Sequence, residues 1–142
     1  SFREQYDMFP RDKGANRRRV MIVDDDPDAL ALMEKILTDE GFELIKVSNA
    51  TEVGLKAAQL SPDLILLDFL MPEINGFEVC KALRENELTR GTPIMAVTCL
   101  SKEQDIERIF SCGADEYLAK PFKVDQMLEK VRELLGRGRI VE

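Results

Sequence analysis

The chain of 142 residues contains no histidine and no tryptophan. Histidine is the commonest general base and metal ligand near neutral pH, so its absence leaves carboxylates, hydroxyls and lysine for any chemistry. There are three cysteines and no CxxC pair, which excludes both a disulfide framework and a cysteine zinc site. Cys80, Cys99 and Cys112 each lie in an apolar stretch, and we predict that all three are small buried core residues.

Long apolar runs and a strong positive charge are also missing. No apolar run approaches the ~20 residues that cross a bilayer, and the first residues lack the apolar segment of a signal peptide. We therefore expect a cytoplasmic protein that does not enter membranes. The net charge of −7 disfavours direct nucleic-acid binding. Residues 1–19 carry six Lys/Arg and three Asp/Glu, a net +3, which leaves −10 on the rest. The basic run at 17–19 is interpreted as solvated, with contact to a phosphate-rich partner as the alternative.

What is present indicates one globular domain. Hydrophobic residues make up 44% and charged residues 33% of the chain, enough to build a core within a domain of ordinary size. Residues 1–18 show no sustained periodicity, so we predict a flexible N-terminal arm, with a short turn around residues 6–9 as a possible feature. The domain is predicted at residues 19–136, followed by a tail or truncated linker at 137–142.

Five short segments rich in leucine or β-branched residues predict β-strands, at residues 20–23, 43–47, 64–67, 94–97 and 116–118. Several are continuously apolar, as expected for strands covered on both faces. Amphipathic segments between them predict helices at residues 27–41, 50–60, 76–87, 101–113 and 124–135. Asp26 before Pro27 predicts the first helix start, an S-x-x-Q capping box from Ser101 predicts the fourth, and Gly136 predicts the last helix end. This alternation indicates an α/β fold with a parallel sheet.

Polar side chains follow four of the predicted strands directly. Asp24 and Asp25 follow the first strand, Asp68 the third, Thr98 the fourth and Lys120 the fifth. In open α/β sheets, ligands bind beyond the carboxyl ends of the strands, where these side chains would meet. Clustered carboxylates repel one another, and a divalent cation relieves that repulsion. Oxygen ligands without histidine or thiolate point to Mg²⁺.

Asp68 is the candidate nucleophile. A strand-end carboxylate beside a metal can attack phosphorus and form an aspartyl phosphate, while Lys120 and the Thr98 hydroxyl meet the phosphoryl oxygens. Each residue also has an ordinary interpretation: a strand-end Asp as a helix cap, Thr98 as a β-branched strand residue, Lys120 as a solvated lysine. Their joint occurrence at four strand ends favours a phosphoryl site.

Four segments carry a resemblance to a known family: VMIVDDDPDAL, PDLILLDFLMPEINGFEVCKALR, PIMAVTCLS and GADEYLAKPF. In this order and spacing, residues 18–136 closely resemble the receiver domain of two-component response regulators. The resemblance implies a flavodoxin-like fold, a five-stranded parallel sheet of order 2-1-3-4-5 with five flanking helices.

The resemblance also implies a ligand set. Asp68 would accept the phosphoryl group, Asp25 would bind Mg²⁺ directly and Asp24 mainly through water. The backbone carbonyl of Leu70 would complete the protein ligands.

The remaining site residues take their implied roles from the same family. Lys120 and Thr98 would contact the phosphoryl group, and Tyr117 would be the aromatic switch that turns inward with Thr98. The Lys120–Pro121 peptide bond would be cis.

The function implied is signalling and not enzymatic turnover. A sensor histidine kinase or a phosphotransfer protein would donate the phosphoryl group, and the domain would catalyse only its own phosphotransfer and dephosphorylation. The surface of the fourth helix (101–113), fifth strand (116–118) and fifth helix (124–135) would then change its packing and control a downstream protein or output domain. The same surface is a candidate for homodimer formation.

Two features depart from the family's commonest pattern. Cys99 stands where a small alanine is typical, and we interpret it as a tolerated small residue. Leu70 and Leu100 are apolar at positions that border the attacking water, which leads to the hypothesis that the phosphorylated form is long-lived.

Three other functions share part of this pattern of residues. An aspartyl-phosphate phosphatase of the haloacid-dehalogenase type would need a D-x-D signature, which can be forced onto Asp24 and Asp26 or onto Asp26 and Asp28, the latter with Pro27 between them. It would also need a cap domain, for which the chain lacks room. An EF-hand fails at Ala29 and Lys35, where that loop requires Gly and Glu. A receiver-like scaffold that is never phosphorylated remains the third.

Overall fold

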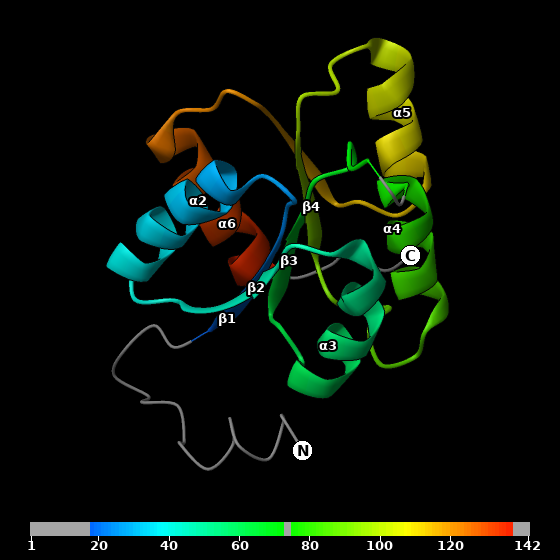
Figure 1. Cartoon of the computed structure of the whole chain (residues 1–142), viewed down its shortest axis with the longest axis horizontal. Helices are drawn as coiled ribbons and strands as arrows, with labels where there is room; N and C mark the ends of the chain where they lie inside the picture. The colour runs from blue at the N-terminus through cyan, green and yellow to red at the C-terminus, as the bar shows by residue number, and fades with distance from the viewer. Residues whose placement is uncertain (1–17, 73–74, 138–142) are drawn as a thin grey trace.

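The computed structural model describes residues 18–72 and 75–137, and Figure 1 shows a sheet between two layers of helices. The strands are β1 (Arg19–Val23), β2 (Glu43–Val47), β3 (Leu64–Leu67), β4 (Ile94–Thr98) and β5 (Glu116–Ala119). All pairings are parallel and the order is β2-β1-β3-β4-β5, which confirms the predicted topology. The predicted turn at residues 6–9 and nearly all of the predicted arm and tail lie outside the described residues.

The helices divide between the two faces of the sheet. α2 (Pro27–Asp39) and α6 (Val124–Arg137) cover one face; α3 (Val53–Leu60), α4 (Gly76–Glu85) and α5 (Glu103–Ser111) cover the other (Figure 1). A short 3₁₀ turn, η1 (Ala50–Glu52), precedes α3. The predicted fourth and fifth helices are therefore α5 and α6. No helix among residues 18–72 and 75–137 has the length and apolar character to cross a membrane.

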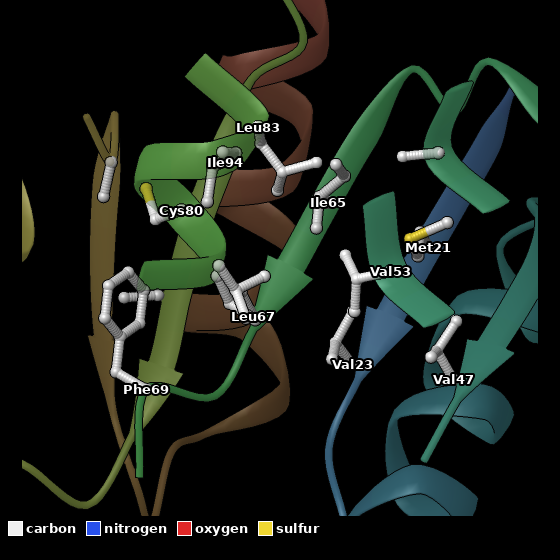
Figure 2. Close-up of a cluster of buried hydrophobic side chains, with 14 of the residues drawn as sticks. Met21, Val23, Val47, Val53, Ile65, Leu67, Phe69, Cys80, Leu83 and Ile94 are labelled. Atoms are coloured by element: carbon white, nitrogen blue, oxygen red, sulfur yellow. The ribbon is translucent and has the colours of Figure 1, made fainter. Parts of the chain in front are cut away.

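Alternation along the strands builds a core on each side of the sheet. In β1, Met21 and Val23 pack toward α3 and α4, whereas Val20 and Ile22 pack toward α2 and α6. Figure 2 shows part of the first cluster, with side chains of the sheet meeting those of α3 and α4. Burial on both faces explains why the strand sequences are continuously apolar.

The helix ends show which local signals hold. Asp26 caps α2 as predicted, since its Oδ1 accepts a hydrogen bond from the Asp28 N–H at 3.0 Å. The capping box at Ser101 is wrong, because α5 begins at Glu103 behind Lys102 and has no side-chain cap. The predicted end of the last helix is also wrong, because α6 continues through Gly136 to Arg137. A helical glycine costs only about 1 kcal/mol, which the buried side chains of α6 outweigh.

A buried arginine joins three segments at the amino end of the sheet. Arg19 is 3% exposed, and its backbone N–H donates to Oδ2 of Asp63 at 2.8 Å. Its guanidinium donates to Oε2 of Glu43 at 3.1 Å and to the Leu60 carbonyl at 3.0 Å. The start of β1 is thereby bound to the start of β2 and to the segment between α3 and β3.

Candidate functional site

Two carboxylates are fixed by the sheet at the carboxyl ends of β1 and β3. The N–H of Asp24 donates to the Val47 carbonyl at 3.1 Å, and that of Asp68 to the Val23 carbonyl at 3.0 Å. Both residues thus continue the hydrogen-bond ladder one position beyond their strands. Their exposed fractions are 1% and 6%, so both carboxylates are buried at the site. The backbone positions of Asp24 and Asp68 are therefore fixed by the pairing of the strands.

Asp25 completes a group of three carboxylates. One carboxylate oxygen each from Asp24, Asp25 and Asp68 lies within 4.8 Å of the others, and Asp25 is the exposed member. An all-oxygen donor set that is open to solvent on one side fits a hard cation such as Mg²⁺, which keeps several waters. The sequence predicted this grouping, and the structure brings the three residues together.

Lys120 lies between two of these carboxylates. Its Nζ is 2.5 Å from Oδ2 of Asp24 and 3.1 Å from Oδ2 of Asp68. The N–H of Lys120 donates to the Thr98 carbonyl at 2.9 Å, so the β4–β5 pairing positions the lysine. The peptide bond to Pro121 is cis, as predicted.

Burial and charge act in opposite directions on this pair. Burial raises the pKa of Asp24, and the hydrogen bonds from Lys120 and from the Asp26 N–H do not overcome it. Burial alone would lower the pKa of Lys120, but the hydrogen bonds and charges of Asp24 and Asp68 outweigh it and raise that pKa. The lysine is therefore held charged, whereas the buried Asp24 carboxylate lacks sufficient positive charge around it. A bound cation would supply more.

The backbone around Asp68 is closely packed. Oδ1 of Asp68 accepts a hydrogen bond from the Leu70 N–H at 2.9 Å, while the Leu70 side chain is 56% exposed. Gly76, at the start of α4, approaches this loop so closely that a Cβ there would lie 2.4 Å from Cα of Phe69 and 3.0 Å from the Asp68 carbonyl oxygen. The start of α4 is thus placed directly against the segment that carries Asp68. The role of the Leu70 carbonyl stays a prediction.

Thr98 and Tyr117 both bind Leu100, a connection that the sequence did not reveal. The Thr98 hydroxyl oxygen accepts a hydrogen bond from the Leu100 N–H at 3.4 Å, and the Tyr117 hydroxyl donates to the Leu100 carbonyl at 2.5 Å. Thr98 is fully buried and Tyr117 half-buried, packed against the core on the α4 and α5 side. Burial raises the pKa of the Tyr117 phenol. The two predicted switch residues are therefore linked through one loop residue.

The three cysteines differ in burial, which corrects the prediction that all are core residues. Cys80 is buried, Cys112 is half-buried and Cys99 is exposed. Cys99 follows the last residue of β4 and lines a hollow of about 440 Å³ with Lys120 and Phe122. Cys99 lies one residue beyond the end of β4, whose own residues are all buried, so it has left the part of the strand that the two helical layers cover.

The comparisons with known proteins all find response regulators. A family model for the response regulator receiver domain matches residues 20–132. The chain is 41% identical over 119 residues to the DNA-binding dual master transcriptional regulator RpaA of a Synechocystis strain, covering 84% of this chain and 49% of RpaA. It is 35% identical to the polar-differentiation response regulator DivK of Brucella anthropi, covering 84% of this chain and 97% of DivK. The chain thus spans about half the length of its DNA-binding relative and nearly all of DivK.

A solved structure shows the same architecture. The receiver domain of the sensor histidine kinase PA1611 from Pseudomonas aeruginosa, with magnesium coordinated in its active-site cleft, superposes with a TM-score of 0.79. The two share 26% identity, over 85% of this chain and 99% of the other.

Proposed function

This chain belongs to the response regulator receiver domain family of two-component systems, and on that premise we propose that Asp68 accepts a phosphoryl group from a partner protein. The observation that carries the proposal is the gathering of Asp24, Asp25 and Asp68 around one point, with the ammonium of Lys120 on two of them. The donor would be a sensor histidine kinase or a phosphotransfer protein.

In the proposed transfer, a carboxylate oxygen of Asp68 attacks the phosphorus of the donor. The bond from phosphorus to the donor's imidazole nitrogen breaks, and the imidazole leaves. Lys120 already contacts Oδ2 of Asp68, so its charge is in place to meet the added negative charge. Asp68 is held by two N–H groups, its own bonded to Val23 and that of Leu70 bonded to its side chain, which orients the nucleophile.

The donor set supports Mg²⁺ as the cofactor. Asp24, Asp25 and Asp68 would hold it together with the backbone carbonyl of Leu70. When bound, Mg²⁺ would supply the positive charge that three close carboxylates and a phosphoryl group require. Burial raises the pKa of Asp24, so a bound cation would reduce the cost of its buried negative charge.

The output would begin at Thr98. Its bond to the Leu100 N–H is long at 3.4 Å, so its hydroxyl can be drawn to a new phosphoryl group at little cost. Tyr117 holds the carbonyl of the same residue, and the start of α5 follows shortly after. A change at Leu100 would therefore reach the surface formed by α5, β5 and α6. We propose that a downstream protein or output domain reads this surface, and that it is a candidate site for homodimer formation.

Labelling with acetyl phosphate tests the proposal directly. The protein is incubated with acetyl phosphate with and without Mg²⁺, and its intact mass is measured. We expect one phosphoryl group in Mg²⁺, much less in chelator, and none on Asp68→Asn. Asp125→Asn, an exposed change on α6, is the matched control and should label like the natural protein.

Equal labelling of Asp68→Asn would refute the assignment of the acceptor. No labelling under any condition would instead indicate an interaction scaffold, and steady release of phosphate from a phosphomonoester would indicate a phosphatase.

A further inference from the structure

Two cysteines, one in α4 and one at the end of α5, lie against each other on the face of the sheet that these helices cover. Cys80 lies in α4, and Cys112 caps the end of α5, 32 positions further along the chain. The Cys80 thiol donates to the Cys112 carbonyl at 3.5 Å, and the Cys112 thiol donates to the Ile109 carbonyl at 3.1 Å. Figure 2 shows Cys80 among the buried side chains of α4. The pair is built into the α4–α5 contact.

An arginine clamp holds this contact in register. Arg84 lies four positions after Cys80, so both project from the same side of α4. Its guanidinium donates to the Gly113 carbonyl at 2.9 Å and to Oδ2 of Asp115 at 2.8 Å. Gly113 has a φ of 117°, and a Cβ there would lie 2.6 Å from Cγ of Arg84. The turn directly after Cys112 is therefore fixed to the α4 face that carries Cys80.

The two thiols differ in burial and in the direction in which their surroundings shift the pKa. A hydrogen bond from the Cys80 thiol lowers the pKa of Cys112, and the positive charge of Arg108 acts in the same direction. The same hydrogen bond, together with burial, raises the pKa of Cys80. Cys112 is half-buried and Cys80 fully buried. Cys112 is thus the thiol that solvent can reach, and the buried Cys80 lies beside it as a second cysteine.

We propose that Cys80 and Cys112 form a reversible dithiol–disulfide pair that responds to peroxide. The Cys112 thiolate attacks one peroxide oxygen, the O–O bond breaks, and a sulfenic acid and hydroxide form. The Cys80 sulfur then attacks the Cys112 sulfur, the S–O bond breaks, and the departing oxygen leaves as water with the Cys80 proton. Two thiols are oxidised by two electrons in all, and one peroxide is reduced to two waters. A thiol reductant reverses the bond by exchange.

Closing the pair requires the Cys112 side chain to leave its present hydrogen bond. The present contact is a hydrogen bond, so the Cys112 side chain must turn from the Ile109 carbonyl toward Cys80 to reach a bond of about 2.05 Å. The product would join the end of α5 to α4. If α5 repacks on phosphorylation as proposed above, the disulfide would restrain that movement; this consequence rests on the proposed function, whereas the thiol chemistry does not.

Cys99 offers the matched control. It is exposed at the carboxyl end of β4, whereas the turn after Cys112 bonds to the amino end, with the Asp115 N–H on the Ile94 carbonyl at 2.8 Å. Cys99→Ser removes this third thiol and with it the principal route to links between molecules. All oxidation can then be assigned to Cys80 and Cys112.

The experiment uses the full chain carrying Cys99→Ser, treated with one equivalent of hydrogen peroxide and digested without reduction. We expect both free thiols to be lost, the peptides of Cys80 and Cys112 to be linked with loss of two hydrogens, and dithiothreitol to restore both thiols. Adding Cys80→Ala should leave Cys112 as a sulfenic acid that dimedone traps, and adding Cys112→Ser should abolish oxidation. Two free thiols after treatment, a sulfinic acid at Cys112 beside a free Cys80, or links only between molecules would each overturn the proposal. Because the parent variant keeps both cysteines, it decides the matter even if Cys80→Ala fails to fold.

Discussion

The ammonium of Lys120 lies 2.5 Å from Oδ2 of Asp24, although 96 positions separate the two residues in the chain. The contact neutralises one carboxylate of a group of three, so excess negative charge remains at the end of the sheet. Burial remains the largest influence on Asp24 and raises its pKa despite the contact with Lys120. A bound cation would offset this negative charge and should therefore stabilise the folded protein.

Asp24→Asn should not lower the free energy of unfolding in Mg²⁺-free buffer at neutral pH. A pKa raised in the folded state means that Asp24 contributes stability below its unfolded pKa of about 3.8, which is lost as pH rises through the folded pKa. A neutral amide at this position does not titrate and therefore removes that pH-dependent loss of stability. Urea unfolding measures the effect.

Added Mg²⁺ should reverse this order, because the natural protein binds it more tightly and is stabilised by mass action. Asp39→Asn, an exposed change at the end of α2, keeps all three site carboxylates, so it serves as the control and Mg²⁺ should stabilise it as much as the natural protein. A large loss of stability in Asp24→Asn without Mg²⁺ would contradict the account of the site given above.

Gly76→Ala should destabilise the protein by about 1–3 kcal/mol, because the new methyl group would meet backbone atoms that cannot move independently. It should also slow labelling by acetyl phosphate, since the displaced backbone carries Asp68. Gly54→Ala in α3 is the matched control: nothing lies within 4 Å of its Cβ, and helix propensity should make it neutral or more stable by up to about 1 kcal/mol. Equal stability of the two variants in thermal or urea unfolding would count against the close packing at Gly76.

Tyr117 should ionise at a higher pH than a free phenol, because burial raises its pKa. The chain has only two tyrosines, so Tyr6→Phe leaves Tyr117 as the sole phenol in an ultraviolet titration. The folded protein should titrate later than the same variant in denaturant. Stability from this phenol is present below its unfolded pKa of about 10 and declines as pH rises through the folded value. Coincident titration curves in the two states would disprove the burial effect.

Leu70→Asn should shorten the lifetime of the phosphorylated form by roughly tenfold, equivalent to about 1.4 kcal/mol in the barrier. The natural side chain is apolar and 56% exposed beside Asp68, so it offers no polar atom to orient an attacking water. The decay of phosphorylated protein after removal of acetyl phosphate gives the rate. Leu32→Asn, an exposed leucine on α2, controls for polarity away from the loop. An unchanged or slower decay in Leu70→Asn would refute the hypothesis.

The strands and the group of three carboxylates could be predicted from the sequence, because a single physical rule determines the position of each. Continuous apolar runs can only be satisfied between two helical layers, and residues that end parallel strands must meet at one edge. Asp24 and Asp68 are positioned by ladder hydrogen bonds that any parallel sheet would form.

Features set by tertiary contacts were not predictable in the same way. The S-x-x-Q pattern at Ser101 is local, but the helix start depends on where the loop leaves β4, so α5 begins two residues later. Burial of one side of α6 carries that helix past Gly136. The shared contact of Thr98 and Tyr117 with Leu100, and of Cys80 with Cys112, joins segments distant in sequence, for which a single chain gives no periodic signal.

The two ends of the sheet differ in how well their charges are paired, and Arg19 is the buried charge at the amino end. At the amino end, its buried guanidinium donates hydrogen bonds to the Glu43 carboxylate and to the Leu60 carbonyl. These contacts pair the arginine charge with a carboxylate and attach β1 to its neighbours. The carboxyl end carries the three close carboxylates, and one of its loop bonds, from the Leu100 N–H to the Thr98 hydroxyl, is long at 3.4 Å. If the proposed phosphorylation rearranges the carboxyl end, these contacts of Arg19 would keep the strands aligned at the amino end.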